Sequence, residues 1–159
     1  MDNNNILSKL EKLDAILSHI NNVRDNCLKL GKYLIKNNRE QLGLLLIANS
    51  QIHDHSKFFG IEWDNIADRH GNPELIKVTV FHHNHTNMHH PEYWGSIHNM
   101  PDVYLAEMVC DWKARSNEFG GDLIDWVTNK ATIRFKFTLD DLVGIKIKEF
   151  LNIILEKQF

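Results

Sequence analysis

Cysteine is scarce in this 159-residue chain, and long apolar runs are absent. Its two cysteines, Cys27 and Cys110, lie too far apart in sequence to form a closely spaced metal-binding pair. A disulfide framework is therefore not expected, which favours a reducing compartment. No apolar segment reaches the roughly 20 residues of a membrane span, and the N-terminal MDNNNILSKLEKLDAIL lacks the features of a signal peptide. We expect a cytoplasmic protein with no membrane partner.

An excess of positive charge is also missing. The formal net charge is −3 with neutral histidines, whereas a general nucleic-acid-binding surface usually shows a basic excess. The sequence contains no Walker-type glycine spacing, no nucleophilic serine elbow and no cysteine–histidine nucleophile pattern. These absences argue against general nucleic-acid binding. They leave open a local basic pocket for a small phosphorylated ligand.

Prolines number only three and glycines eight, and most of the chain has helical periodicity. Apolar residues between Ile6 and Ile35 recur at the spacing of a helix that packs one face, with a kink or an end expected at Gly31. The stretch LGLLLIA after Arg39 is apolar nearly all round and indicates a central, buried helix. Helices are predicted over residues 6–35, 39–57, 73–85, 101–119, 122–132 and 142–157. With 43% hydrophobic and 25% charged residues, this pattern predicts one all-α domain over residues 1–159.

Histidine, in contrast, is abundant. Five of the ten histidines fall within residues 82–90, in the segment FHHNHTNMHHPEYWG. The neutral imidazole is the commonest nitrogen ligand for transition metals, although a histidine-rich segment can also be a solvated surface. On one continuous helix, His82, His85 and His89 would share a row and His83 and His90 another, so both rows could not face one site.

Two aspartates follow apolar helical segments and are predicted to point inward. Asp54, near the end of the second predicted helix, continues the row of Ile47 and Gln51. Asp111, within LAEMVCDW, lies over Met108 and Tyr104 on its predicted helix. A buried carboxylate is costly unless a cation neutralises it. A metal ion between the two helices would do so. An ion pair would do so as well, and the candidate cations for it are Arg115, Arg69 and Lys57.

A lone histidine at the margin of an apolar stripe, as His19 is, usually belongs to the core. Its place in the chain order changes the interpretation: His19, then His53-Asp54, then further histidines, then Asp111. This order resembles the HD-domain superfamily of metal-dependent phosphohydrolases, which is all-helical.

The segments HDHSK and HHPEYWG are similar to the HDxxGK and HHE segments of the HD-GYP branch of that superfamily. However, Ser56 replaces the glycine, Pro91 separates the histidine pair from the glutamate, and GYP is absent, so cyclic-dinucleotide specificity is not implied. A closer resemblance is to a small uncharacterised family of bacterial and phage proteins with HDxSKF, HHPEYW and EMxCDW motifs. It covers about residues 13–117 and implies an HD-like bundle of about five to seven helices, with C-terminal helices over 122–157.

The resemblance implies a site for one or two metal ions. The implied ligands of a first ion are His19, His53, Asp54 and Asp111. Asp54 would bridge to a second ion held by His83 with His89 or His90, which leaves His82 and His85 outside the ligand set. Mixed nitrogen and oxygen ligands suit Mn, Fe, Co, Ni or Zn better than calcium. Besides Asp54, the expected catalytic residues are Lys57, as a charge on the substrate phosphate, and Glu92, to orient water or a metal-bound histidine; both are also ordinary surface residue types.

These features predict a metal-dependent phosphohydrolase that acts on a nucleotide or another small phosphate ester. Two other interpretations remain open: a non-catalytic protein that binds a nucleotide or a partner with the same pocket, and oxygenase chemistry on an iron pair. Trp63, Tyr93, Trp94 and Trp112 are either core residues or a wall for a base. The amphipathic last helix offers a face for a possible homodimer.

Overall fold

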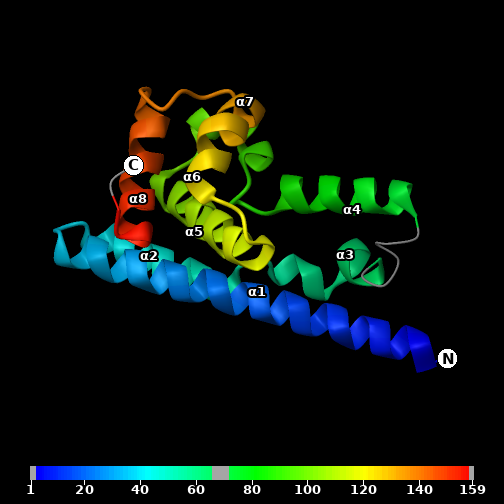
Figure 1. Cartoon of the computed structure of the whole chain (residues 1–159). Coiled ribbons are helices and arrows are strands. Elements are labelled where there is room, and N and C mark those ends of the chain that lie inside the picture. Colours follow the sequence, from blue (N-terminus) through cyan, green and yellow to red (C-terminus); the bar gives the residue numbers. More distant parts are fainter. Residues whose placement is uncertain (1–2, 66–71, 158–159) are drawn as a thin grey trace.

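A computed structural model describes residues 3–65 and 72–157 of the chain (Figure 1). Its α-helices are α1 (Asn3–Lys36), α2 (Glu40–Asn49), α3 (Gly60–Asp64), α4 (Pro73–Thr86), α5 (Asp102–Phe119), α6 (Leu123–Trp126), α7 (Thr132–Phe135) and α8 (Leu142–Leu155). The 3₁₀ turns are η1 (Ser50–Ile52), η2 (His55–Phe58), η4 (Pro91–Trp94) and η5 (Ile97–Asn99), and the π-helical turn η6 (Val127–Ala131) joins α6 to α7. No β-strand occurs in these residues, which confirms the all-α prediction. No helix among them is long and apolar enough to cross a membrane.

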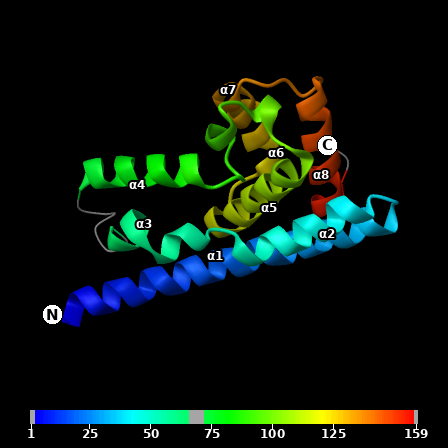
Figure 2. The same cartoon turned by 180° about the vertical axis from the view of Figure 1, so that it is seen from behind.

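The long helix α1 forms the base of the molecule (Figure 1). α2 returns beside it, α5 lies against both, and α8 packs on α5 and α1. Seen from behind, α3 and α4 form an arm at one side, with α4 running above α3 (Figure 2). The segment between α4 and α5 leads back from this arm to the core.

The crossing of α1 and α2 depends on two glycines. A Cβ atom at Gly43 would lie 2.5 Å from the carbonyl oxygen of Gly31, and one at Gly31 would lie 2.6 Å from Cγ1 of Ile47. Both distances are shorter than any real Cβ contact, so the two backbones can touch only because neither residue has a side chain. Gly31 does not end α1, which was one of our two expectations for it, because the helix continues to Lys36; its lack of a side chain allows α2 to approach.

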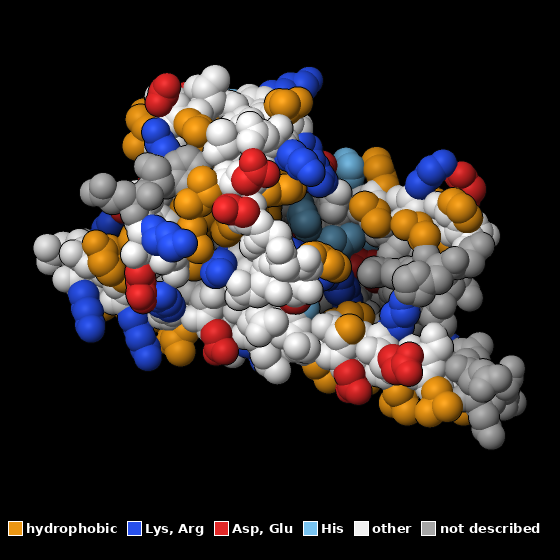
Figure 3. All heavy atoms as spheres, in the orientation of Figure 1, with side chains coloured by type: hydrophobic (Ala, Val, Ile, Leu, Met, Phe, Trp, Pro, Cys, Tyr) orange, Lys and Arg blue, Asp and Glu red, His pale blue; other side chains and the backbone are white. Residues whose placement is uncertain are grey.

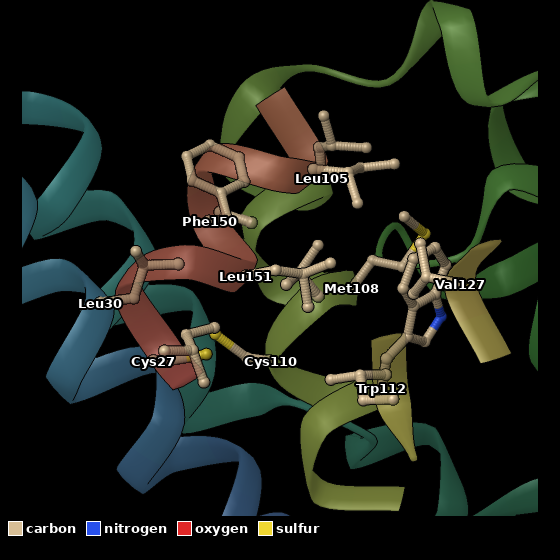
Figure 4. Packing of buried hydrophobic residues seen from close by; sticks show 14 of the residues in the cluster. Cys27, Leu30, Leu105, Met108, Cys110, Trp112, Val127, Phe150 and Leu151 are labelled. Carbon is tan, nitrogen blue, oxygen red and sulfur yellow. The ribbon is translucent and has the colours of Figure 1, made fainter. Parts of the chain in front are cut away.

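The apolar core joins α1, α5 and α8 (Figure 4). Cys27 of α1, Met108 of α5 and Phe150 and Leu151 of α8 are all fully buried in it. Both cysteines are free thiols, and both are buried. Because α8 turns its apolar side toward this core, that side is not the free dimer face that we expected, and homodimerisation stays a prediction.

The second predicted helix ends earlier than expected. It was predicted to continue to residue 57, but α2 stops at Asn49 and the short turn η1 follows. The guanidinium of Arg24, on α1, donates hydrogen bonds to the carbonyl oxygens of Ser50 (3.3 Å) and Gln51 (2.7 Å), which satisfies acceptors at the end of the helix. α2 is also less buried than LGLLLIA indicated, since Leu44 and Leu45 are exposed.

Candidate metal centre

Asp54 lies in the turn between η1 and η2, at the centre of a polar cluster. Its backbone adopts the left-handed conformation (φ 57°), which aspartate tolerates better than most residues. This turn directs the carboxylate into the protein, where Asp54 is 1% exposed. The expected direction was correct, but the expected cause was wrong, because the helical row that we invoked ends before this residue.

On one side of Asp54 lie His19 from α1, His53 from the end of η1 and Asp111 from α5; we call these three residues the first group. Nε2 of His19 is 3.4 Å from Oδ2 of Asp54 and 3.0 Å from Oδ1 of Asp111. Nε2 of His53 is 3.7 Å from the same Oδ2 atom of Asp54. The structure thus brings together all four residues of the predicted first site from three distant parts of the chain.

On the other side lie His83, His89 and His90, which we call the second group. Nε2 atoms of His83 and His89 are 3.3 Å and 3.5 Å from Oδ1 of Asp54. The rings of His89 and His90 lie 4.2 Å apart, and those of His83 and His90 lie 4.8 Å apart, as centroid distances. One ring nitrogen from each of the three histidines lies within 4.8 Å of a ring nitrogen of the other two.

The second group forms because α4 ends at Thr86. His89 and His90 follow the helix end, so the chain can turn them back onto His83, and the two helical rows expected from the sequence do not apply to them. His82 instead contacts Glu62, and His85 stacks on Phe81 with a 3.9 Å centroid distance. Both therefore lie outside the cluster of ring nitrogens, as predicted.

Several buried polar atoms of the cluster make no hydrogen bond with any described residue: Nε2 of His19, His53, His89 and His90, and Oδ1 of Asp54 and Asp111. Buried polar groups without partners are rare and costly. Across the cluster, histidine Nε2 atoms lie 3.0–3.7 Å from carboxylate oxygens of Asp54 and Asp111. These distances resemble the spacing of ligands around one ion, since metal bonds of about 2.0–2.2 Å place neighbouring ligand atoms about 3.0–3.5 Å apart. The cluster therefore fits divalent transition-metal ions on both sides of Asp54.

Three glutamates contact the Nδ1 atoms of three of the clustered histidines. Glu118 lies 2.8 Å from Nδ1 of His19 and Glu107 lies 2.9 Å from Nδ1 of His53. Glu62, which is fully buried, lies 2.8 Å from Nδ1 of His83. A carboxylate on Nδ1 keeps the proton there and leaves the lone pair of Nε2 free to bind a metal.

These glutamates were missed by the sequence analysis. The available signal was on α5, where Glu107 lies four residues before Asp111 and Glu118 seven residues after it, so that all three share one side of the helix. Glu62 had no comparable signal, because it belongs to the short helix α3.

The charges of the cluster favour a cation at its centre. Burial, the largest influence, raises the pKa of Asp54, but Lys57 and His53 lower it more, to well below its usual range. The pKa of His53 is raised: burial lowers it, but the charge of Asp54 and the contact with Glu107 outweigh this effect. The field of the carboxylates thus draws positive charge onto the first group, either as a proton or as a metal ion.

His89 and His90 are in the neutral form that binds metals. Burial, together with the charges of His53 and His90, holds the pKa of His89 well below its usual range. Burial and the charge of His83 lower the pKa of His90 to about 4. Neither ring competes for a proton near neutral pH.

The ion-pair alternative is realised in part. The ammonium group of Lys57 contacts Oδ2 of Asp54, and the residue is 5% exposed. Arg115 is more distant, with Nε 3.9 Å from Oδ1 of Asp111, and Arg69 lies outside the described residues. Arg115 also pairs with Glu118, with Nη1 3.0 Å from Oε2. Among the described residues no lysine or arginine pairs with Glu62 or Glu107, and none comes closer than 3.9 Å to Asp111.

Glu92 is held by residues other than the clustered histidines. Its Oε1 accepts hydrogen bonds from Arg134 (3.2 Å) and Asn84 (3.4 Å), whereas the histidine rings are held by the three glutamates above. Its predicted catalytic role, like that of Lys57, stays a prediction. Of the expected aromatic wall, Trp94 packs against Tyr104 with a 5.5 Å centroid distance, and only Trp112 reaches a cavity beside the cluster.

The cluster lies at the floor of a hollow. Figure 3 shows histidine side chains recessed between the helices at the top of the molecule and the arm formed by α3 and α4, with basic and acidic side chains at the edge. His90 of the second group lines a cavity that a small ligand can enter.

A family model matches residues 8–156. The chain belongs to DUF5662, a family of unknown function. No curated protein and no solved structure gives a match. The chemistry of this DUF5662 protein therefore has to be inferred from its own site.

Proposed function

We propose that this DUF5662 protein is a metal-dependent phosphohydrolase that acts on a nucleotide or another small phosphate ester. The observation that carries the proposal is the two-sided environment of Asp54. Each carboxylate oxygen faces histidine Nε2 atoms at 3.3–3.7 Å, and three of these histidines have Nδ1 held by a glutamate. A carboxylate between two such groups can bridge two ions.

The ligands of a first ion would be the first group with Asp54, and those of a second would be the second group with Asp54. Imidazole and carboxylate ligands suit Mn, Fe, Co, Ni or Zn. When bound, such ions polarise phosphoryl oxygens and lower the pKa of water near a phosphorus centre.

The remaining residues would bind and orient the ester. Arg115 borders the hollow beside Asp111, and its guanidinium is positioned to contact a phosphate oxygen. Lys57 limits the negative charge of Asp54, so that an anionic substrate is less strongly repelled. The net charge of −3 still argues against nucleic-acid polymers as substrates.

The first test is elemental analysis of the purified chain beside Asp54→Ala and Asp111→Ala, with Asp125→Ala, an exposed acid of α6, as the matched control. We expect transition metal in the wild type and in the control, a reduced content in Asp111→Ala and little in Asp54→Ala. Metal-stimulated release of phosphate from a nucleotide panel should follow the same order. Wild-type protein without metal and without metal-stimulated hydrolysis would refute the proposal.

One observation favours a second candidate, a non-catalytic binder. The ammonium of Lys57 contacts the carboxylate that would bridge the ions, and a buried lysine can neutralise it without metal. In that case nucleotides should raise the melting temperature of wild type and of His53→Ala equally, with no turnover in either.

A further inference from the structure

A cavity of about 310 Å³ opens beside the second group. It lies between the C-terminal half of α5, α6 and α7, and its inner end is formed by His90 and Asp111. The buried Nε2 of His90 and Oδ1 of Asp111 have no hydrogen bond with described residues. The cavity is thus continuous with the candidate metal centre, although most of its wall comes from residues outside the histidine and aspartate motifs.

Aromatic side chains form the wall of this cavity. Trp112 meets Trp126 edge to face, with centroids 5.0 Å apart, and is stacked with Phe135 at 5.8 Å and 12°. Phe119 lines the mouth and is 79% exposed. An exposed aromatic ring beside an aromatic cavity offers a face on which a flat ligand can stack.

Two arginines border the same cavity, and each retains unused donors. Nη1 of Arg115 lies 3.0 Å from Glu118, and Nη2 of Arg134 lies 3.2 Å from Glu92. The guanidinium of Arg134 also stacks over the ring of Phe135, 4.7 Å from its centroid. Since a guanidinium has five N–H donors, both arginines can contact a phosphate without leaving their present partners.

The charges along the cavity limit the ligand to few phosphates. The charged residues of its lining are Arg115, Arg134, Asp111 and Asp122, so their formal charges cancel. A chain of three phosphates would need more positive charge than this lining supplies, whereas one phosphate directed at the metal centre would not. The volume is at the lower end of the range for small-ligand sites, about 300–1,000 Å³.

We propose that this cavity binds the base of a nucleoside monophosphate, stacked on Trp126 and Phe119, with its phosphate directed between the two arginines and the second group. The binding site for the base, which we call the ring site, is inferred from the cavity alone. The direction of the phosphate rests on the function proposed above. The glutamate partners of both arginines then fix the guanidinium planes in the orientation that a phosphate requires.

The test is isothermal titration calorimetry on the full chain loaded with Mn²⁺. The first probe is the methylene phosphonate analogue of adenosine monophosphate, which cannot be hydrolysed. The second is the corresponding phosphonate of ribose 5-phosphate, which lacks the aromatic ring of the base. The third is adenosine triphosphate. The variants are Phe119→Ala and Trp126→Ala. Ile133→Ala is the matched control, because Ile133 is 76% exposed on α7 and lies outside the cavity.

We expect the ring-bearing monophosphonate to bind at least about tenfold more tightly than the ring-free one, and more tightly than the triphosphate, since stacking of one base typically contributes this much. Phe119→Ala and Trp126→Ala should each remove most of this difference and leave the ring-free probe unchanged, while Ile133→Ala changes neither. Phe119 is so exposed that its loss should not affect folding, and circular dichroism of Trp126→Ala checks the other variant.

Equal binding of the two phosphonates, or equal losses for both in the variants, would overturn the inference. Its failure is distinguishable from failure of the proposed function. Metal-dependent hydrolysis without preference for a ring leaves the function standing and removes the ring site. Ring-dependent binding that persists in protein lacking both metal and turnover leaves the ring site standing and removes the function.

Discussion

The two groups on either side of Asp54 differ in how the fold holds them. The first group comes from α1, the end of η1 and α5, helices that pack on one another around the core, and both of its histidines have a glutamate within 2.9 Å. The second group comes from the end of α4 and the residues after it. Among the described residues, His83 is the one member of this group with a carboxylate within 2.9 Å of Nδ1. Nδ1 of His89 lies 3.8 Å from Glu107, which already holds His53.

The two groups should therefore bind ions unequally. Fixed ring orientations reduce the entropy lost when a metal binds. We expect the first group to hold its ion more tightly and the second group to exchange it more readily. Both groups border the aromatic cavity, the first through Asp111 and the second through His90.

The largest expected effect comes from removing the residue that the two groups share. Asp54→Asn keeps the shape of the side chain and tolerates the left-handed backbone, but it loses the charge that both ions need. Metal content should fall by more than about 100-fold on both sides. Elemental analysis measures it, and Asp54→Asn/Lys57→Met controls for the lysine that the single change leaves buried without its anion.

Asp111→Asn should affect only the first group. Titration of the metal-loaded wild type with a chelator is expected to show two steps, of which the tighter one disappears in this variant. His90→Ala should remove the weaker step instead. One common step in all three proteins would show that the two groups do not act separately.

The glutamates that contact Nδ1 of the clustered histidines should affect the two groups separately. Glu118→Gln and Glu107→Gln should each weaken the tighter step by about 10–100-fold, because the ring orientation is no longer fixed. Glu62→Gln should weaken only the other step. Chelator titration separates these effects from folding, which thermal unfolding checks for each variant.

The crossing of α1 and α2 should link the stability of the fold to metal binding by the first group. Gly43→Ala places a Cβ against the backbone of Gly31 and should lower the free energy of unfolding by about 1–3 kcal/mol. Since α1 carries His19 and α2 leads to His53, the tighter metal step should weaken as well, and the second should not. Chemical unfolding and chelator titration measure the two effects, and Gly121→Ala, which meets open space, is the control.

The smallest effect is expected far from both groups, at the N-cap of α8. Slight burial raises the pKa of Asp141, but backbone hydrogen bonds from Thr138 and Gly144 outweigh it and lower the pKa. A lowered pKa in the folded state means stability that is present above the unfolded value of about 4 and is lost as the pH falls through the folded pKa. Asp141→Ala should cost about 1 kcal/mol at pH 7 and less at pH 3, with metal binding unchanged. Asp141→Asn, which keeps an N-cap oxygen without the charge, should show a much weaker pH dependence in chemical unfolding.

Sequence reasoning was most accurate where local rules apply. The predicted helices over 73–85, 101–119 and 142–157 agree closely with α4, α5 and α8. It was wrong where one helix meets another, since the close contact of Gly31 with Gly43 and the hydrogen bonds of Arg24 at the end of α2 join residues that no local pattern connects.

The amino-acid sequence alone determined the all-α class and the supply of imidazole and carboxylate groups, because periodicity and side-chain chemistry are local properties. Tertiary structure decided which of these groups meet. The left-handed turn at Asp54 and the end of α4 at Thr86 direct the side chains inward. The packing of α1 and α5 then brings Glu118 to His19 across 99 residues. Such contacts depend on backbone reversals and on the packing of distant helices, and neither leaves a periodic signal in the chain.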